Sequence, residues 1–262
     1  MPARLPHEAR MTRIGLLGVT GRMGRAIADA APQHGAAIAG GIDGAGRVHG
    51  GHETAEALAN ASDVLVDFSV PDALAANLDL ALAAGKPILV GTTGFGKAHQ
   101  ARIDAAAKHI AVLQTANTSL GVNLLAFLVE EAARRLGPDW DAEILEMHHR
   151  HKRDAPSGTA LLLGAAVNRG RGAASDTELN RFERMQAGPH EREPGGVYYA
   201  SLRGGSVAGD HLVVFAGEHE RIELGHRAES RAVFAIGAVK AACWLAGKPA
   251  GRYSMRDVLG LG

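Results

Sequence analysis

The sequence predicts an α/β protein: a doubly wound, Rossmann-type parallel-sheet domain and a smaller α+β domain with a mostly antiparallel sheet. From Arg13 onward, apolar runs of strand length alternate with longer helix-periodic segments, which is typical of parallel strands joined by crossover helices. A glycine-rich turn follows the first of these runs. After about residue 120 the alternation ends, and short strand-like runs separated by turn residues take its place.

The first domain is expected to contain five parallel strands with helices between them. The predicted strands are Arg13–Val19, Ala36–Ile42, Val64–Phe68, Pro87–Gly91 and Ile110–Leu113. The intervening segments are rich in alanine and leucine, which favour helices. These predicted helices lie near Met23–Gln33, Thr54–Asn60, Pro71–Ala84 and Lys97–Lys108.

The second half of the chain mixes helices with short strands. The expected elements are a helix over Val122–Leu136, a strand near Glu143–Met147, a helix from Thr159, and strands over Val197–Arg203, Ser206–Phe215 and Arg221–His226. The last three strands are joined by short Gly-containing turns, which favour an antiparallel meander. A final apolar helix, Ala232–Leu245, could pack back onto the first domain.

Composition excludes several classes of protein. Lys plus Arg and Asp plus Glu both number 28, so the formal charge is zero and no general basic field favours a nucleic acid partner. No apolar run approaches the roughly 18 residues of a membrane span, and the N-terminus lacks a secretory core, so a cytoplasmic protein without a membrane partner is expected. The single cysteine, Cys243, can form neither an intrachain disulfide nor a multi-thiolate metal site.

The first predicted strand runs into a turn with the spacing GxxGxxG, at Gly18, Gly21 and Gly24. Glycine allows a tight turn and close backbone approach to a pyrophosphate, and the helix behind it offers N–H groups and a positive dipole end. An ordinary glycine turn would show the same motif, which departs from GxGxxG. Asp43, at the end of the second predicted strand, favours a dinucleotide because a carboxylate there can accept hydrogen bonds from ribose hydroxyls.

Asp43 also bears on which dinucleotide binds. Its charge would repel a 2′-phosphate, and the next residue is Gly44 rather than an arginine, so NADH is the favoured cofactor. Arg47 lies in the glycine-containing segment that follows and could swing toward a phosphate, so NADPH remains possible.

The densest polar stretch of the chain is EMHHRHKRDAPSGTA, residues 146–160. A metal site is disfavoured because the spacing is not HExxH and neighbouring cations would oppose a dication. A solvated basic loop is a second possibility. An anionic substrate explains more of the residues: Lys152 supplies a charged donor, a helix beginning after Ser157 can hold a carboxylate, and histidine can give up a proton near neutral pH.

The residues of this stretch closely resemble the signature of the 4-hydroxy-tetrahydrodipicolinate reductase (dihydrodipicolinate reductase) family. Further motifs resemble that family in its order, and together they cover the chain from Met11 to Leu261. They are GVTGRMG at 18–24, VDFS at 66–69, GTTGF at 91–95, TANTSLGVN at 115–123 and SRAVFAIGAVKAACWL at 230–245.

The resemblance implies NAD(P)H-dependent reduction of 4-hydroxy-tetrahydrodipicolinate, through dihydrodipicolinate, to tetrahydrodipicolinate in the diaminopimelate route to lysine. It implies a small dicarboxylate substrate and a homotetramer. The predicted domains are a dinucleotide-binding domain over residues 11–120 and 230–262 and a substrate-binding and oligomerisation domain over 121–229. Residues 1–10, which carry two prolines and no periodicity, are expected to be a disordered extension or the result of an upstream start. A related NAD(P)-dependent dehydrogenase of another amino or imino acid, and an NAD(H)-sensing regulator without turnover, remain alternatives.

The resemblance also assigns roles to residues. It assigns proton transfer to His148 and Lys152, and substrate contact to His149, Gly158 and Thr159. It assigns cofactor contact to three loops and one acid, namely Gly18, Val19, Thr20, Gly21, Arg22 and Met23; Asp43; Gly91, Thr92 and Thr93; and Thr115, Ala116, Asn117 and Thr118. The family often has an aromatic residue at the position of Thr118 and an arginine at that of Gly44, which leaves nicotinamide packing and cofactor choice open.

Overall fold

The computed structural model describes residues 10–183 and 187–261. These residues divide into two compact units. The first unit runs to Thr118 and resumes over Phe234–Gly260, and the second contains Ser119–Val233 together with Leu261. The predicted disordered extension over residues 1–10 lies outside the described residues except for Arg10, whose guanidinium pairs with Asp63 at 3.0 Å.

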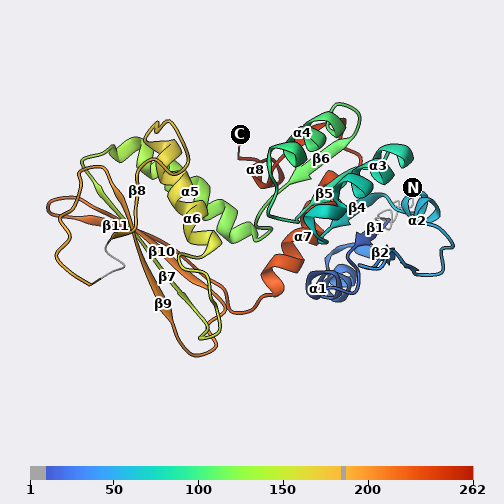
Figure 1. Ribbon diagram of the computed structural model, residues 1–262, viewed down its shortest axis with the longest axis horizontal. Helices are drawn as coiled ribbons and strands as arrows, with labels where there is room; N and C mark the ends of the chain where they lie inside the picture. Colours follow the sequence, from blue (N-terminus) through green and yellow to red (C-terminus); the bar gives the residue numbers. More distant parts are fainter. Residues whose placement is uncertain (1–9, 184–186, 262) are drawn as a thin grey trace, which may run out of the picture. The chain divides into compact units, whose positions relative to one another are not determined.

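The sheet of the first unit has the strand order β12-β6-β5-β4-β1-β2-β3 within the described residues (Figure 1). Its strands are β1 Thr12–Leu17, β2 Ala36–Ile42, β3 Val48–His49, β4 Val64–Asp67, β5 Ile88–Val90, β6 Ala111–Gln114 and β12 Gly251–Tyr253. All neighbours are parallel except the short edge strand β3. The five predicted parallel strands are therefore confirmed, and β3 and β12 extend the sheet at its two edges.

Helices cover both faces of this sheet. They are α1 Arg22–Ala30, α2 Ala55–Ala61, α3 Leu74–Ala84, α4 Lys97–Ala106 and α7 Ala232–Leu245, with short helices at Ala31–His34, Pro71–Ala73 and Met255–Leu259 (α8). Leu78 of α3 and Ile103 of α4 belong to one buried cluster with Leu65 and Val90 of the sheet. In Figure 1, α3 and α4 lie on one side of the sheet and α1 and α7 on the other, so the doubly wound prediction is confirmed.

The strand order fixes where this unit can bind a ligand. The chain passes from β1 outward to β2 and β3, then returns to the other side of β1 to build β4, β5 and β6. The two halves of the sheet therefore diverge between β1 and β4, and ligands of open α/β sheets bind at the carboxyl ends of strands at such a switch point.

The second unit contains a sheet with the order β11-β10-β7-β9-β8. Its elements are α5 Leu120–Leu136, β7 Asp141–His148, α6 Gly158–Gly170, β8 Asn180–Arg181, β9 Val197–Arg203, β10 Asp210–Ala216 and β11 Arg221–Arg227. The ladders of β10 with β7 and with β11 are antiparallel, as the predicted fold class requires. The predicted meander of β9, β10 and β11 is wrong, because β7 separates β9 from β10 and pairs with β9 in parallel.

One face of this second sheet is covered by α5 and α6, which lie side by side (Figure 1). Val129 of α5 and Leu163 of α6 pack with Ile144 and Phe215 of the strands in one buried cluster. Alternate side chains of β7 therefore point into this core. The polar side chains of Glu146 and His148 lie on the same face and are also buried. None of the helices in the described part of the chain is long and apolar enough to cross a membrane.

Candidate functional site

The turn between β1 and α1 has no room for side chains at Gly18 and Gly24. Gly18 has φ +92°, and a Cβ there would lie 2.5 Å from the carbonyl oxygen of Phe68. A Cβ at Gly24 would lie 2.4 Å from the carbonyl oxygen of Gly18. Gly21 precedes the first residue of α1, with extended φ and ψ and no side-chain cap. The backbone at this helix N-terminus can therefore be approached closely, which is what a pyrophosphate requires.

A cleft of about 910 Å³ opens in front of this turn. Of the predicted cofactor residues, Gly18, Thr20, Gly21 and Asp43 line it. Val19 belongs to the same turn, and Arg22 and Met23 begin α1. Phe68, Ser69 and Val70, after β4, also line the cleft and were not predicted as site residues. The order of the strands places this segment beside the glycine turn, because β4 is the neighbour of β1 at the switch point. Its place in the cleft therefore follows from the sheet topology and not from a sequence motif.

The carboxylate of Asp43 is held at the end of β2. Its Oδ1 accepts hydrogen bonds from the N–H groups of Ala45 (2.9 Å) and Arg47 (3.0 Å), and its Oδ2 contacts Nε of Arg47 (2.8 Å) and Nε2 of His49 (3.0 Å). The hydrogen bond with His49, followed by those from Arg47 and Ala45, holds the pKa of Asp43 far below its usual range against the opposing effect of burial. Asp43 is thus a fixed negative charge, and its Arg47 partner has a side chain that is 76% exposed.

The loops after β5 and β6 lie further along the same sheet edge. Thr92 is buried, and its hydroxyl contacts both Oδ1 of Asp67 (3.1 Å) and the N–H of Ser69 (2.9 Å). Burial raises the pKa of Asp67, a buried acid at the end of β4. The predicted residues Gly91, Thr92 and Thr93 are therefore joined through buried Thr92 to the loop after β4 that lines the cleft.

The threonine hydroxyls after β6 shape their own loop. Thr115 Oγ1 donates to the carbonyl oxygen of Asn117 (2.7 Å), and Thr118 Oγ1 donates to that of Phe234 (2.6 Å). Thr118 is 3% exposed, so its side chain anchors this segment to α7. The hydroxyls of Thr115 and Thr118 are therefore engaged within the protein, and cofactor contact by Thr115, Ala116, Asn117 and Thr118 stays a prediction.

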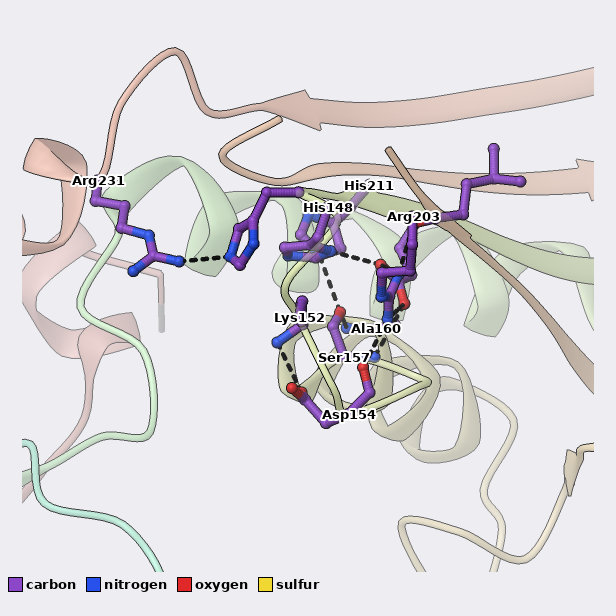
Figure 2. A network of polar contacts seen from close by, with 11 residues as sticks. His148, Lys152, Asp154, Ser157, Ala160, Arg203, His211 and Arg231 are labelled. Atoms are coloured by element: carbon purple, nitrogen blue, oxygen red, sulfur yellow. Dashed lines mark hydrogen bonds and ion pairs between the residues drawn. The ribbon is translucent and has the colours of Figure 1, made fainter. Parts of the chain in front are cut away.

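The second cluster of predicted residues lies where β7 ends, in the second unit (Figure 2). His148 is the last residue of β7 and is 8% exposed. Its Nδ1 lies 2.5 Å from Oε2 of Glu146, and its ring meets that of His211 edge to face at 5.1 Å between centroids. A Cβ at Gly209 would lie 3.0 Å from Nε2 of His148, so a glycine stands where a side chain would cover that nitrogen.

Glu146 is the best-connected acid of this cluster. The guanidinium of Arg203 donates to both carboxylate oxygens, Nη1 to Oε2 at 2.8 Å and Nη2 to Oε1 at 2.7 Å. The N–H of Ser157 donates to Oε1 at 3.2 Å. Burial alone would raise the pKa of Glu146, but the hydrogen bonds of Arg203 and His148 hold it below its usual value. Glu146 is therefore an ionised carboxylate that is 2% exposed.

The loop between β7 and α6 carries the predicted cation. Lys152 Nζ pairs with Oδ2 of Asp154 at 2.7 Å, and the Lys152 side chain is 20% exposed. His149 lies beside it, with Nε2 2.8 Å from Nη2 of Arg231. Burial, then the charge of Arg231, lowers the pKa of His149, which therefore favours its neutral form. Figure 2 shows Arg231 projecting toward this loop from a separate segment of the chain.

The start of α6 completes the cluster. Ser157 caps the helix by accepting a hydrogen bond from the N–H of Ala160 (3.2 Å), and Gly158 and Thr159 are the first two residues of the helix. The positive end of the helix dipole thus lies in the same loop as Lys152. This arrangement can bind a carboxylate and hold an imidazole for proton transfer.

Sequence reasoning missed several members of this cluster, among them Glu146, Arg203 and His211. Glu146 could have been found, because it lies two residues before His148 on a predicted strand and so shares its face. Arg203 and His211 lie on β9 and β10, the two strands that flank β7, and only the strand order brings them together.

Comparisons with known proteins agree with this picture. The family description "Dihydrodipicolinate reductase, N-terminus" matches residues 12–118, and "Dihydrodipicolinate reductase, C-terminus" matches residues 121–259. A 4-hydroxy-tetrahydrodipicolinate reductase of Zymomonas mobilis is 57% identical over 249 residues, covering 95% of this chain and 97% of the relative. The reductase of Parvibaculum lavamentivorans is 48% identical over 267 residues, covering 95% and 98%.

Solved structures share the fold. A dipicolinate-bound dihydrodipicolinate reductase from Paenisporosarcina sp. TG-14 matches with a TM-score of 0.75 at 22% identity, covering 93% of this chain and 97% of that one. An amine dehydrogenase from Mycobacterium smegmatis matches with a TM-score of 0.61 at 15% identity, covering 93% and 95%. Because the family matches span both units and full-length relatives reach 57% identity, the chain belongs to the dihydrodipicolinate reductase family.

Proposed function

We propose that the protein reduces 4-hydroxy-tetrahydrodipicolinate, through dihydrodipicolinate, to tetrahydrodipicolinate in the diaminopimelate route to lysine. The chain is an NAD(P)H-dependent oxidoreductase of the dihydrodipicolinate reductase family. The observation that carries the substrate assignment is the cluster at the end of β7. There a buried histidine, a lysine and a helix N-terminus meet in one loop.

The cofactor residues are proposed from the first unit. The glycine turn fits a pyrophosphate because side chains at Gly18 and Gly24 would clash with backbone, and Asp43 offers a permanently charged acceptor for ribose hydroxyls. The bound nicotinamide would supply the hydride. NADH is the proposed preference because the Asp43 carboxylate lines the same cleft and opposes a 2′-phosphate. Arg47 is largely exposed and could leave Asp43 for a phosphate, so NADPH would serve as a weaker alternative.

The substrate residues are proposed from the second unit. A doubly anionic ring needs two centres of positive potential. Lys152 and His149 would hold one side, and the N-terminus of α6 at Gly158 and Thr159 would accept a carboxylate on the other. Binding would draw Lys152 away from its partner Asp154, whose side chain is 60% exposed and can take up water instead.

Proton transfer is assigned to His148 and Lys152. The Nδ1 atom of His148 is held by Glu146, so Nε2 is the nitrogen available to give a proton to the substrate or take one from it. Lys152, in the adjoining loop, is a second donor with three N–H bonds. The hydride and one proton together reduce one double bond of the ring.

A homotetramer in the cytoplasm is part of the proposal. The face of the second sheet opposite α5 and α6 carries large apolar side chains, among them Leu145 (36% exposed) and Leu202 (54% exposed). They line a shallow hollow of about 470 Å³ with Leu212. An exposed apolar sheet face of this kind fits an interface between copies of the chain. Analytical ultracentrifugation of the full chain should give four times the monomer mass.

The direct test is the loss of NADH absorbance at 340 nm with enzymatically generated 4-hydroxy-tetrahydrodipicolinate. Turnover is expected with this substrate, and inhibition is expected with a planar pyridine dicarboxylate. A regulator that only binds NAD(H) would show binding by calorimetry and no loss of absorbance. A dehydrogenase for another imino acid would turn over faster with that acid in a competition assay, and either result would overturn the proposal.

A further inference from the structure

We propose that Glu146 is a positioning residue for the reaction: it holds His148 with hydrogen on Nδ1 and thereby makes Nε2 the nitrogen that exchanges a proton with substrate. The assignment of His148 to proton transfer rests on the proposed function, but the state of the ring is a property of the free protein. The proposed tautomer of His148 and its proposed role in proton transfer can therefore be contradicted independently of each other.

The hydrogen-bond pattern around Glu146 determines which atom of the pair donates. Arg203 donates to both carboxylate oxygens, and the N–H of Ser157 donates to Oε1. A carboxylate surrounded by such donors is ionised and can only accept. The contact of 2.5 Å between Oε2 and Nδ1 of His148 must then be an N–H donated by the imidazole. A neutral ring with hydrogen on Nδ1 has its lone pair on Nε2.

The position of Glu146 makes this arrangement rigid. Glu146 and His148 are two residues apart on the same face of β7, which is hydrogen-bonded to β9 and β10 on its two sides. The carboxylate is 2% exposed, so water does not compete for its oxygens. The same carboxylate also accepts a hydrogen bond from the N–H of Ser157, the residue that caps α6. One buried charge therefore fixes the imidazole relative to the helix N-terminus proposed to hold the substrate carboxylate.

No side chain at position 209 covers the other nitrogen of the ring, because that residue is glycine. Gly209 has φ +155°, and a Cβ there would lie 3.0 Å from Nε2 of His148. In the proton step, the imidazolium gives the hydrogen on Nε2 to the substrate, keeps the hydrogen on Nδ1 against Glu146, and becomes neutral. Water then returns one proton to Nε2.

The substitution Glu146→Gln keeps the shape of the side chain and changes one acceptor into a donor. If the amide oxygen takes the place of Oε1, the NH₂ group faces His148 and forces Nδ1 to accept, which moves the ring hydrogen to Nε2. If the oxygen takes the place of Oε2, the NH₂ group faces the N–H of Ser157, and the tie to the start of α6 is broken. Both arrangements also oppose one N–H of Arg203.

The ring state can be read by long-range ¹H–¹⁵N correlation spectra of the full chain labelled on histidine, recorded at alkaline pH and assigned with His148→Gln. In the unsubstituted protein we expect the Nδ1–H tautomer for His148. The Nε2–H tautomer would overturn the proposal, and this result requires neither a Glu146 variant that folds nor any turnover. In Glu146→Gln we expect the Nε2–H form, or a mixture of both.

Kinetics supply the second readout, with a matched control. Glu146→Gln should lower kcat by about 100-fold, at the lower end of acid–base contributions, while KM changes less than about threefold. Glu130→Gln is the control, because Glu130 is also a buried carboxylate that pairs with arginine, here Arg134 and Arg169 on the helices α5 and α6. The Glu130→Gln variant should have the same kcat and the same His148 tautomer as the unsubstituted protein. An equal fall of kcat in both variants would mean that Glu146 acts through stability alone.

Discussion

The hydroxyl of Ser157 lies 3.2 Å from Nε2 of His211 and also accepts a hydrogen bond from the N–H of Ala160, so the cap of α6 contacts a buried imidazole of β10. Burial, followed by the charge of His148, lowers the pKa of His211 to about 4. His211 is therefore neutral at neutral pH, although the carboxylate of Glu146 in the same cluster is ionised.

The depressed pKa of His211 predicts an acid-sensitive second unit. The unfolded chain binds a proton at this residue near pH 6.5 and the folded chain only near pH 4, so stability falls as pH falls through that window. The loss should reach about 2 kcal/mol at pH 5. His211→Gln, whose amide can still bond Ser157, should flatten this dependence in urea unfolding measured at pH 7.5 and pH 5. His219→Gln, at an exposed position, is the control and should keep the pH dependence of the unsubstituted protein. An equal loss of unfolding free energy between pH 7.5 and pH 5 in all three proteins would contradict the prediction.

Gly164 should not tolerate a side chain. A Cβ at this position of α6 would lie 1.8 Å from the hydroxyl oxygen of Tyr199, which donates to Oδ1 of Asn180 at 2.9 Å. Gly164→Ala should destabilise the protein by about 2 kcal/mol, as measured by chemical denaturation, because overpacking pushes α6 from the sheet. Gly158→Ala is the matched control, since its added Cβ would meet no atom of the described residues within 4 Å beyond its chain neighbours and its own helix backbone. The stability of this variant should stay within about 0.5 kcal/mol of the unsubstituted protein.

The proposed proton-transfer residues should affect turnover. His148→Gln and Lys152→Ala should each lower kcat by more than about tenfold, since each removes a group positioned to exchange a proton. Arg153→Ala removes a cation from the same loop at an exposed position and should leave kcat within about twofold of the unsubstituted enzyme. Full activity of either of the first two variants would remove that residue from the mechanism.

The proposed cofactor preference has its own test. The ratio of kcat/KM values should favour NADH, and Asp43→Ser should shift the ratio toward NADPH by about tenfold because the repulsive carboxylate is gone. Arg47→Ala should lower kcat/KM for NADPH more than for NADH, if the exposed guanidinium turns to a 2′-phosphate. A preference for NADPH above tenfold in the unsubstituted protein would show that Asp43 does not control the choice.

Local sequence by itself determined most of the first unit. The strand-to-helix turn at Gly18 needs a positive φ and close packing that a side chain would block. The glycine motif therefore predicts the conformation of this turn directly. Asp43 ends a strand that pairs with its neighbour in sequence, and β4, β5 and β6 follow one another along the sheet. Because each of the five predicted parallel strands lies beside one that is near in sequence, periodicity and turn residues were enough to predict these strands and the doubly wound class.

Tertiary structure decided the second sheet and the surroundings of His148. Short connections favoured pairing β9 with β10, but β7, formed some fifty residues earlier in the chain, lies between them and pairs with both. Arg203 and Glu146 are 57 positions apart, and Ser157 and His211 are 54 apart. Such partners are brought together only by the order of the strands in the sheet. That order depends on burying the whole sheet against α5 and α6 and not on a local sequence pattern. The local motif thus predicted His148 as a site residue, while the strand order placed Arg203 and His211 beside it.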